Sequence, residues 1–484
     1  MSDPTAPAEP PPGEYDPHYP RLHLRPARYW VNDPNGLVHH DGRWHVFAQA
    51  NPDATVHTDV CWWHADSEDL LHWRDLGIAI RPSHDPDRAD RDGVWSGNAV
   101  SDGGVLRAFY SAFRTDAGWQ PAMGADAADG VTFVPGDRVL ATAPAEVELP
   151  DGTRTRVHTL RDPYVWRDSD PRGQPAWSLV LGAGLDAADG RRWAAALRFT
   201  SSDLDYWTWA GVFAYVAAID TVVDDAEVDP GEMWECPAYA ELVDTATGGV
   251  LSVLTVCSWA RGTGIGRSLL VTGDRRGDRV RVAGMELSDH GDALYAPSLL
   301  PAPDGRTLFW GWVRETRPLA DSVEAGWSGC LTFPRELRAA GGRVTVWPAA
   351  ELTGLRAREQ TLEPGAGTTT GTAVEVLLAE VADGARVRLT ARKAMLEVEV
   401  AGDAATLAVR TPDATSDAGA RDPSRLRLPG SGERWLRLLV DGSVVELFTS
   451  AGEVATTRVY PGPGHAGWSV EVHAGRCRVW DLEL

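Results

Sequence analysis

Cysteine is scarce in this chain and follows no pattern that binds a metal or forms a bridge. The five cysteines are odd in number and widely separated: Cys61, Cys236, Cys257, Cys330 and Cys477. None belongs to a CxxC pair, so the sequence indicates neither a disulfide framework nor a zinc site. We therefore expect five reduced thiols.

Long apolar runs and an excess of basic residues are also lacking. No stretch approaches the roughly 18 apolar residues that a membrane-spanning helix needs. The 46 lysines and arginines are outnumbered by 69 aspartates and glutamates, which gives a formal net charge of -23. A charge of this sign repels nucleic-acid phosphates and anionic membrane surfaces. We expect a soluble protein that binds neither nucleic acid nor a membrane.

The first residues lack the features of a secretory signal. Residues 1–14 are rich in Pro, Ala and Glu, and they have neither a basic start nor an apolar stretch. We therefore expect a disordered tail over residues 1–20 and a cytoplasmic location.

A short strand pattern is present five times. Each copy is rich in the apolar and aromatic residues of buried strands. Successive copies begin roughly 55 to 75 residues apart, about the length of one four-stranded propeller blade with its loops. The pattern favours a propeller or a similar array of β units. The copies are residues 44–50, 106–112, 177–183, 251–258 and 307–313.

The pattern changes after Leu337. Shorter alternating segments, such as residues 373–378, are then separated by Gly, Asp and Pro turns, which is typical of an antiparallel sandwich. We place a boundary near residues 345–360. One domain is then expected to span residues 21–345 and a second to span residues 355–484.

A polar motif precedes each of the five strands by roughly 11 to 16 residues. If the strands belong to blades around one axis, equivalent positions converge on that axis, and the five motifs form one candidate pocket. The motifs are Asn32-Asp33, Trp95-Ser96, Arg161-Asp162, Glu235-Cys236 and Asp292–Tyr295.

Three of the motifs carry acids, and each acid alone has a simpler interpretation. Asp33 precedes a Pro-Asn-Gly turn, which would present its carboxylate at the end of a strand, and alone it would be an Asx turn. Asp162 lies beside Arg161, which could hold it ionised or bind a hydroxyl-bearing ligand, and alone it would be a surface ion pair. Glu235 lies between an indole and a thiol, surroundings that favour a protonated general acid, and alone it would be one glutamate among many.

Together, three acids at equivalent positions suit glycoside cleavage. One carboxylate attacks the anomeric carbon, a second donates a proton to the leaving oxygen, and a third supports the developing positive charge. A metal site is the rival interpretation, but calcium would want more oxygen ligands in one loop, and zinc would usually want His or Cys. We expect no metal.

The ordered set of motifs resembles the β-fructofuranosidases of glycoside hydrolase family 32, which include invertases, inulinases and levanases. The resemblance covers nearly the whole chain. It is carried by Trp30–Gly36, Gln49–Pro52, Trp62–Ala65, Asp69–Trp73, Trp95–Gly97, Arg161–Pro163, Trp234–Pro237, Gly311-Trp312, Pro334–Leu337 and Asp441–Phe448.

This resemblance implies an all-β protein, with a five-bladed propeller followed by a C-terminal antiparallel sandwich and the substrate in the axial funnel. It implies that Asp33 is the nucleophile, Glu235 the acid/base and Asp162 the transition-state stabiliser. Cys236 would tune the proton affinity of Glu235, and no cofactor is implied. The residues implied to bind substrate are Asn32, Gln49, Trp95, Ser96, Arg161 and Trp312.

The chain departs from the family pattern around the pocket. His57-Thr58 stands where relatives carry Trp-Gly, and Ala293-Leu294-Tyr295-Ala296 stands where they carry Asp-Phe-Tyr-Ala, with Asp292 one place early. The leaving-group side is therefore expected to be reshaped. His57 offers less stacking surface than a large aromatic, and it could hydrogen-bond a hydroxyl or, when protonated, attract a phosphate.

The expected function is hydrolysis of terminal β-fructofuranosyl bonds with retention of configuration, through a covalent fructosyl-enzyme. The expected substrate is a small fructoside: sucrose, its phosphorylated form or a short fructo-oligosaccharide. A fructosyltransferase using the same intermediate and a non-catalytic sugar-binding propeller are the alternatives. The oligomeric state stays open.

Overall fold

The computed structural model describes residues 16–169, 173–187, 190–217, 222–223, 226–227, 229–392, 394–410 and 422–484. Most of the tail expected over residues 1–20 lies outside them. The described secondary structure is almost entirely β-strand, with one α-helix, α1 (Leu319–Ala325), and a 3-10 helix at Ala350–Leu355. Within these ranges, no helix has both the length and the apolar character needed to cross a membrane.

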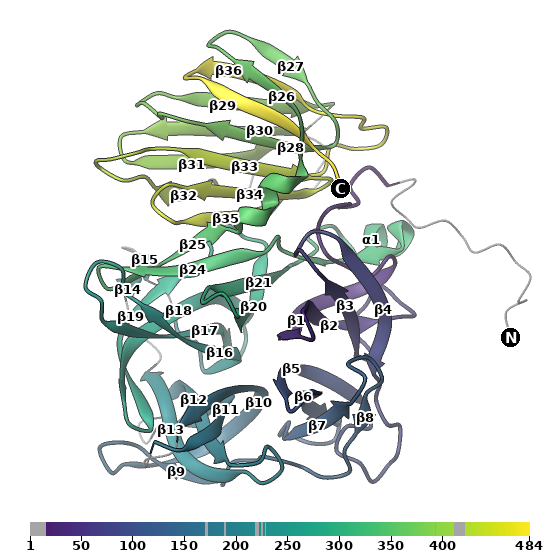
Figure 1. Ribbon diagram of the computed structural model, residues 1–484, viewed down its shortest axis with the longest axis vertical. Coiled ribbons are helices and arrows are strands. Elements are labelled where there is room, and N and C mark those ends of the chain that lie inside the picture. The colour runs from purple at the N-terminus through teal and green to yellow at the C-terminus, as the bar shows by residue number, and fades with distance from the viewer. Residues whose placement is uncertain are drawn as a thin grey trace, which may run out of the picture.

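Five sheets surround one axis and form the blades of a propeller (Figure 1). Blade 1 contains β1 (Tyr29–His40), β2 (Arg43–Asn51), β3 (Cys61–Ser67), β4 (Trp73–Ile80) and β22 (Trp327–Ser328). Blade 2 contains β5 (Gly93–Asp102), β6 (Val105–Phe113), β7 (Ala122–Ala127) and β8 (Val134–Pro135). Blade 3 contains β9 (Glu146–Glu148), β10 (Arg154–Ser169), β11 (Pro175–Asp186), β12 (Arg192–Ser201) and β13 (Thr208–Ala217).

The remaining blades follow in chain order. Blade 4 contains β16 (Met233–Val243), β17 (Val250–Ala260), β18 (Gly264–Arg276) and β19 (Arg279–Leu287). Blade 5 contains β20 (Leu294–Pro301), β21 (Thr307–Val313), β23 (Cys330–Leu331), β24 (Arg335–Ala340) and β25 (Arg343–Pro348). A two-stranded ribbon, β14 (Val222–Val223) with β15 (Ala226–Glu227), precedes blade 4.

The strand predictions are confirmed. The strand of each blade that lies at the axis, called its first strand below, is β1, β5, β10, β16 or β20, and each predicted strand overlaps the next strand in the chain, called the second strand: β2, β6, β11, β17 or β21. The polar motifs lie on or just before the first strands. Those first strands pack against one another in the order β1, β5, β10, β16 and β20, and β20 contacts β1 again. The ring is also closed along the chain, because β22 pairs in parallel with the start of β1.

Every first strand carries a β-bulge at its motif. The pairing with the second strand shifts between Val31 and Pro34, Trp95 and Gly97, Arg161 and Tyr164, Glu235 and Ala238, and Tyr295 and Ser298. A bulge re-aims a side chain away from the regular alternation. Asp33 therefore lies inside β1, not at a strand end as expected, because the bulge lets the strand continue past it.

A proline follows four of these bulge positions, where the missing N–H leaves no unpaired donor. Three residues before proline have left-handed backbones, with φ of 60° at Asp162, 48° at Cys236 and 48° at Ala296. This conformation is uncommon for residues with a side chain.

The C-terminal part is a sandwich of two antiparallel six-stranded sheets, which lies above the propeller in Figure 1. One sheet contains, in spatial order, β26 (Arg356–Leu362), β37 (Cys477–Leu482), β28 (Ala373–Leu378), β33 (Leu436–Asp441), β34 (Val444–Thr449) and β35 (Val454–Arg458). The other contains β27 (Gly367–Thr369), β36 (Ser469–Ala474), β29 (Arg386–Ala391), β30 (Ala394–Ala401), β31 (Ala404–Arg410) and β32 (Ser424–Arg427). The all-β fold class is confirmed, and we propose residues 21–345 and 355–484 as the two domains.

Candidate active site

The structure brings together all the residues predicted for the site. One cavity of about 320 Å³ lies at the five first strands, and the three acids and six binding residues all line it. These nine residues are Asn32, Asp33, Gln49, Trp95, Ser96, Arg161, Asp162, Glu235 and Trp312. Positions up to 280 residues apart in the chain, such as 32 and 312, meet because the blades converge.

The Asp33 carboxylate is half-buried and held by donors from three blades. Asn32 Nδ2 donates to its Oδ1 (3.1 Å), and Ser96 Oγ donates to its Oδ2 (2.6 Å). Gln49 Nε2 also reaches Oδ2 (3.2 Å), and the Cys236 thiol lies 3.5 Å from it. Burial, together with the nearby Glu235 charge, outweighs these donors and raises the pKa of Asp33 to about 6.

Asp162 occupies the equivalent position on β10. Its Oδ2 accepts the backbone N–H of Cys236 (2.8 Å), and its own N–H donates to Ser111 Oγ (2.6 Å). Burial raises the pKa of Asp162 to about 7, although the adjacent Arg161 opposes the shift. Ser111 was not predicted, because nothing in its sequence surroundings distinguishes it from other strand serines.

Both oxygens of Glu235 accept hydrogen bonds from pocket side chains. Arg161 Nη1 donates to Oε1 (2.9 Å). The sequence suggests an ion pair between Arg161 and its neighbour Asp162, but in the structure the ion pair of Arg161 is with Glu235. The Tyr295 hydroxyl lies 2.7 Å from Oε2 and 3.2 Å from the carbonyl oxygen of Ser258. The arginine also lies over Trp95, with its guanidinium carbon 5.4 Å from the ring centroid.

His57 is tied into the pocket wall. Its Nε2 lies 3.1 Å from Gln49 Oε1, and its ring makes edge contacts with Trp30 and Trp95. Burial, and then the charge of Arg161, lower the pKa of His57. A neutral ring near neutral pH can hydrogen-bond a hydroxyl but does not attract a phosphate by charge.

Three further lining residues were missed by the sequence analysis: Trp30, Trp259 and Ile265. Trp30 opens the first motif and donates its Nε1–H to Asn32 Oδ1 (2.8 Å). Trp259 and Ile265 face each other beside the turn of the β17–β18 hairpin, and Trp259 pairs with Met233 of the strand that carries Glu235. Cross-strand pairing of this kind leaves no motif, so only the structure reveals it.

The arrangement suits acid–base and nucleophilic chemistry on a sugar. Carboxylates from β1 and β16 share a cavity with a third carboxylate from β10, which is what glycoside cleavage requires. Across the described ranges, no group of three or more His, Cys, Asp or Glu side chains is arranged to hold a metal ion.

Comparison with protein families decides the class of the protein. Residues 23–348 match the glycosyl hydrolases family 32 N-terminal domain, and residues 380–483 match the glycosyl hydrolases family 32 C terminal domain. The chain belongs to glycosyl hydrolase family 32. This family 32 protein is therefore a glycosidase, as the sequence motifs predict.

Curated relatives of this family 32 enzyme match along nearly its whole length. A sucrose-6-phosphate hydrolase of Klebsiella pneumoniae is 33% identical over 482 residues, which cover 96% of this chain and 93% of the relative. A sucrose-6-phosphate hydrolase of Escherichia coli is 30% identical over 483 residues, which cover 92% of this chain and 90% of the relative.

Solved structures share the fold of this family 32 enzyme. A Bombyx mori family 32 β-fructofuranosidase variant in complex with sucrose aligns with a TM-score of 0.76 and 24% identity, over 98% of this chain and 95% of that one. A sucrose-6-phosphate hydrolase from Lactobacillus gasseri aligns with a TM-score of 0.77 and 22% identity, over 98% and 94% of the two chains. The likeness confirms the propeller followed by the sandwich.

Proposed function

We propose that this family 32 glycosidase hydrolyses the terminal β-fructofuranosyl bond of sucrose or a short fructo-oligosaccharide, with retention of configuration. In the first step Asp33 attacks the anomeric C2, the bond from C2 to the leaving oxygen breaks, and Glu235 gives its proton to that oxygen. In the second step Glu235 takes a proton from water, and the water oxygen displaces Asp33 from C2. Asp162 and Arg161 hold fructose hydroxyls in both steps.

The observation that carries this proposal is the environment of the two reacting carboxylates. Asp33 has four neighbouring donors that restrict its orientation, as a nucleophile in a covalent mechanism requires. Glu235 has a donor at each oxygen, and one of them, Tyr295, also lies near the Ser258 carbonyl. That second acceptor lets the tyrosine accept from a protonated Glu235 while donating to Ser258, although its bond to the ionised carboxylate is charge-assisted and therefore the stronger of the two.

The leaving-group side supports a small neutral sugar. Trp259 and Ile265 give the wall beside Glu235 an apolar surface, and Ile265 is 44% exposed at the rim. The lining residues include one arginine, Arg161, and its Nη1 already donates to Glu235. Sucrose is therefore our first candidate. Sucrose 6-phosphate is the second, because the Klebsiella pneumoniae and Escherichia coli relatives are named as hydrolases of that sugar.

We include a cytoplasmic location in this proposal. All five cysteines are free thiols, and four of them are buried. Unpaired cysteines suit a reducing compartment.

Activity measurements on substituted proteins test the roles of the acids. We expect Asp33→Asn and Glu235→Gln each to lower kcat by roughly a thousandfold or more, since each removes a step that no neighbour supplies. Glu241→Gln is a matched control on the same strand, because its side chain is 45% exposed and points away from the cavity. Near wild-type turnover in either site variant would remove the mechanism.

A substrate panel tests the sugar. We expect kcat/KM to be highest for sucrose and lower for sucrose 6-phosphate, a trisaccharide and long inulin, with β-fructofuranose as the first anomer seen by NMR. A preference for sucrose 6-phosphate would replace the first candidate with the second. Release of α-fructofuranose first would rule out a retaining mechanism.

A further inference from the structure

The linker between blades 4 and 5 lies along the edge of the sandwich. Strand β35 is the outermost strand of its sheet, and residues 288–293 run beside it. Ala293 donates its N–H to the carbonyl oxygen of Thr456 (3.1 Å). Gly291 packs so closely that a Cβ atom there would lie 1.9 Å from the same oxygen. The linker therefore has little freedom to move relative to β35.

Thr456 and Asp289 form the tightest part of this contact. The Thr456 N–H donates to Asp289 Oδ1 (2.8 Å), and its hydroxyl donates to Asp289 Oδ2 (2.6 Å). The hydroxyl also accepts from Arg335 Nη2 (2.5 Å), while Arg335 Nη1 donates to Asp289 Oδ2 (2.9 Å). One threonine hydroxyl thus joins a blade 5 arginine to the linker carboxylate.

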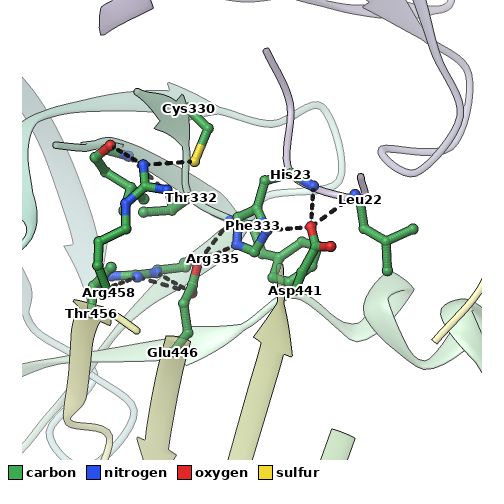
Figure 2. Close-up of polar contacts among 12 residues, drawn as sticks. Leu22, His23, Cys330, Thr332, Phe333, Arg335, Asp441, Glu446, Thr456 and Arg458 are labelled. Carbon is green, nitrogen blue, oxygen red and sulfur yellow. Dashed lines mark hydrogen bonds and ion pairs between the residues drawn. The ribbon is translucent and has the colours of Figure 1, made fainter. Parts of the chain in front are cut away.

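A buried ionic network fixes that arginine in turn. Figure 2 shows Glu446 of β34 between Arg335 and His23, with Asp441 on the far side of the histidine. Arg335 donates to Glu446 through Nε (3.1 Å) and Nη2 (2.9 Å). His23 has Nδ1 2.8 Å from Asp441 and Nε2 3.2 Å from Glu446, so both nitrogens donate only if the ring is protonated. A fully paired buried network of this kind is rigid.

The linker leads directly to the proposed acid/base. Tyr295 follows Ala293 by two residues, and its hydroxyl donates to Glu235 Oε2 (2.7 Å). Burial raises the pKa of Tyr295 well above its usual range, so the hydroxyl keeps its proton and stays a donor. A displacement of the linker is therefore transmitted to the donor that favours the ionised form of Glu235.

We propose that Thr456, although it belongs to the sandwich, is a positioning residue for the reaction, acting through Asp289 and Tyr295 on Glu235. The sandwich thereby supplies part of the acid/base machinery and does more than brace the propeller. This inference rests on the proposed role of Glu235 as acid/base.

The test compares pH–rate profiles of full-length variants on sucrose. The basic limb of the kcat profile reports loss of the proton that Glu235 donates. Tyr295→Phe removes the donor to the ionised form of Glu235, and we expect this limb to move to higher pH by about one unit. Thr456→Val removes the hydroxyl while keeping the side-chain shape. We expect it to move the limb in the same direction by a smaller amount and to lower kcat by about threefold at unchanged KM. Asp289→Asn is a second variant with the same expected direction, in case Thr456→Val does not fold.

Two controls separate positioning from general stability. Thr456→Ser keeps the hydroxyl and should restore the wild-type profile. Thr449→Val alters a buried threonine on the neighbouring strand, away from the linker, and should leave the profile unchanged while lowering thermal stability. In the Tyr295→Phe background, Thr456→Val should add no further shift, because the residue through which it acts is gone.

Three results would overturn the inference. A wild-type profile in both Thr456→Val and Asp289→Asn, with only the unfolding temperature lowered, would show a purely structural role. A limb shift that persists in the Tyr295→Phe background would show that Tyr295 does not transmit the effect. The third result, near wild-type activity of Glu235→Gln, would remove the proposed function and this inference together. Either of the first two results, obtained with an inactive Glu235→Gln, would remove this inference alone.

Discussion

Replacing Ser96 by alanine should move the acidic limb of the pH–rate profile. The Ser96 hydroxyl lies 2.6 Å from Asp33 Oδ2 and accepts a hydrogen bond from Gln49, so its single proton points at Asp33. The bond favours the ionised carboxylate, which is the form that attacks. Without it, Asp33 should hold its proton to a higher pH.

The size of the shift follows from the contacts of Asp33. A hydrogen bond to a charged group contributes about 1.5–3 kcal/mol. One pKa unit corresponds to about 1.4 kcal/mol, so loss of the Ser96 hydrogen bond should raise the pKa of Asp33 by about one to two units. Asn32, Gln49 and Cys236 still face the carboxylate, which favours the lower figure. From a wild-type pKa of about 6 the limb should move to about 7.

The assay is kcat/KM for sucrose between pH 4.5 and 9, because this ratio reports ionisations of the free enzyme. At pH 5 Ser96→Ala should be about tenfold less active than wild type once each profile is scaled to its own fitted pH-independent value. Ser111→Ala, which removes a hydroxyl beside Asp162, and Ser252→Ala, which removes a hydroxyl beside Tyr239, should leave the limb in place. A limb that moves with Ser111→Ala and not with Ser96→Ala would assign it to Asp162 and refute the reasoning.

Other predictions concern the junction and the absence of a metal requirement. Burial opposes a charged His23, but hydrogen bonds with Asp441 and Glu446 outweigh burial and raise the His23 pKa. The stability that His23 contributes is therefore complete below its pKa in the unfolded chain, about 6.5, and is lost as the pH rises through its pKa in the folded protein. Thermal unfolding of wild type and His23→Gln should therefore differ most at low pH and converge at alkaline pH; a constant gap would contradict a protonated ring. Gly291→Ala should destabilise the protein by about 1–3 kcal/mol in urea unfolding, because its Cβ would meet the Thr456 backbone, and an unchanged midpoint would show that the linker can move. Incubation with a chelator should leave activity unchanged, because the described residues offer no cluster of metal-type ligands; loss of activity that a divalent ion restores would contradict this.

The sequence predicted the parts of the site that repeat. Asp33, Asp162 and Glu235 each stand before a buried strand at similar spacing, and this spacing places them on one axis once the strands are blades. Pairing partners did not follow from the sequence. Arg161 precedes Asp162 in the chain but bonds to Glu235, because adjacent residues on a strand point in different directions and the bulge changes which one faces the axis.

Contacts between distant segments were equally hidden. The hydrogen bond between Thr456 and Asp289 joins residues 167 positions apart, and neither residue lies in a motif that suggests a partner. Ile265 enters the cavity because a hairpin brings it opposite Trp259, although both of its chain neighbours are glycines. The alternation of apolar and polar residues predicts which side chains of a strand are buried. It does not predict which residues of the other domain those side chains contact.

The five bulges provide five similar positions around the axis of the propeller, and each blade can carry a different side chain at its position. Each first strand offers the same backbone step, yet one blade places a carboxylate there, another a serine and another a tyrosine next to the step. The ladder hydrogen bonds of each bulge lie within its own sheet, although Asp162 of blade 3 also accepts the backbone N–H of Cys236 in blade 4. Over evolutionary time such a chain could exchange its acids for other side chains and retain a sugar-sized hollow. Exchange of Asp33 or Glu235 alone would then end sugar cleavage while the other residues that line the cavity remain in place.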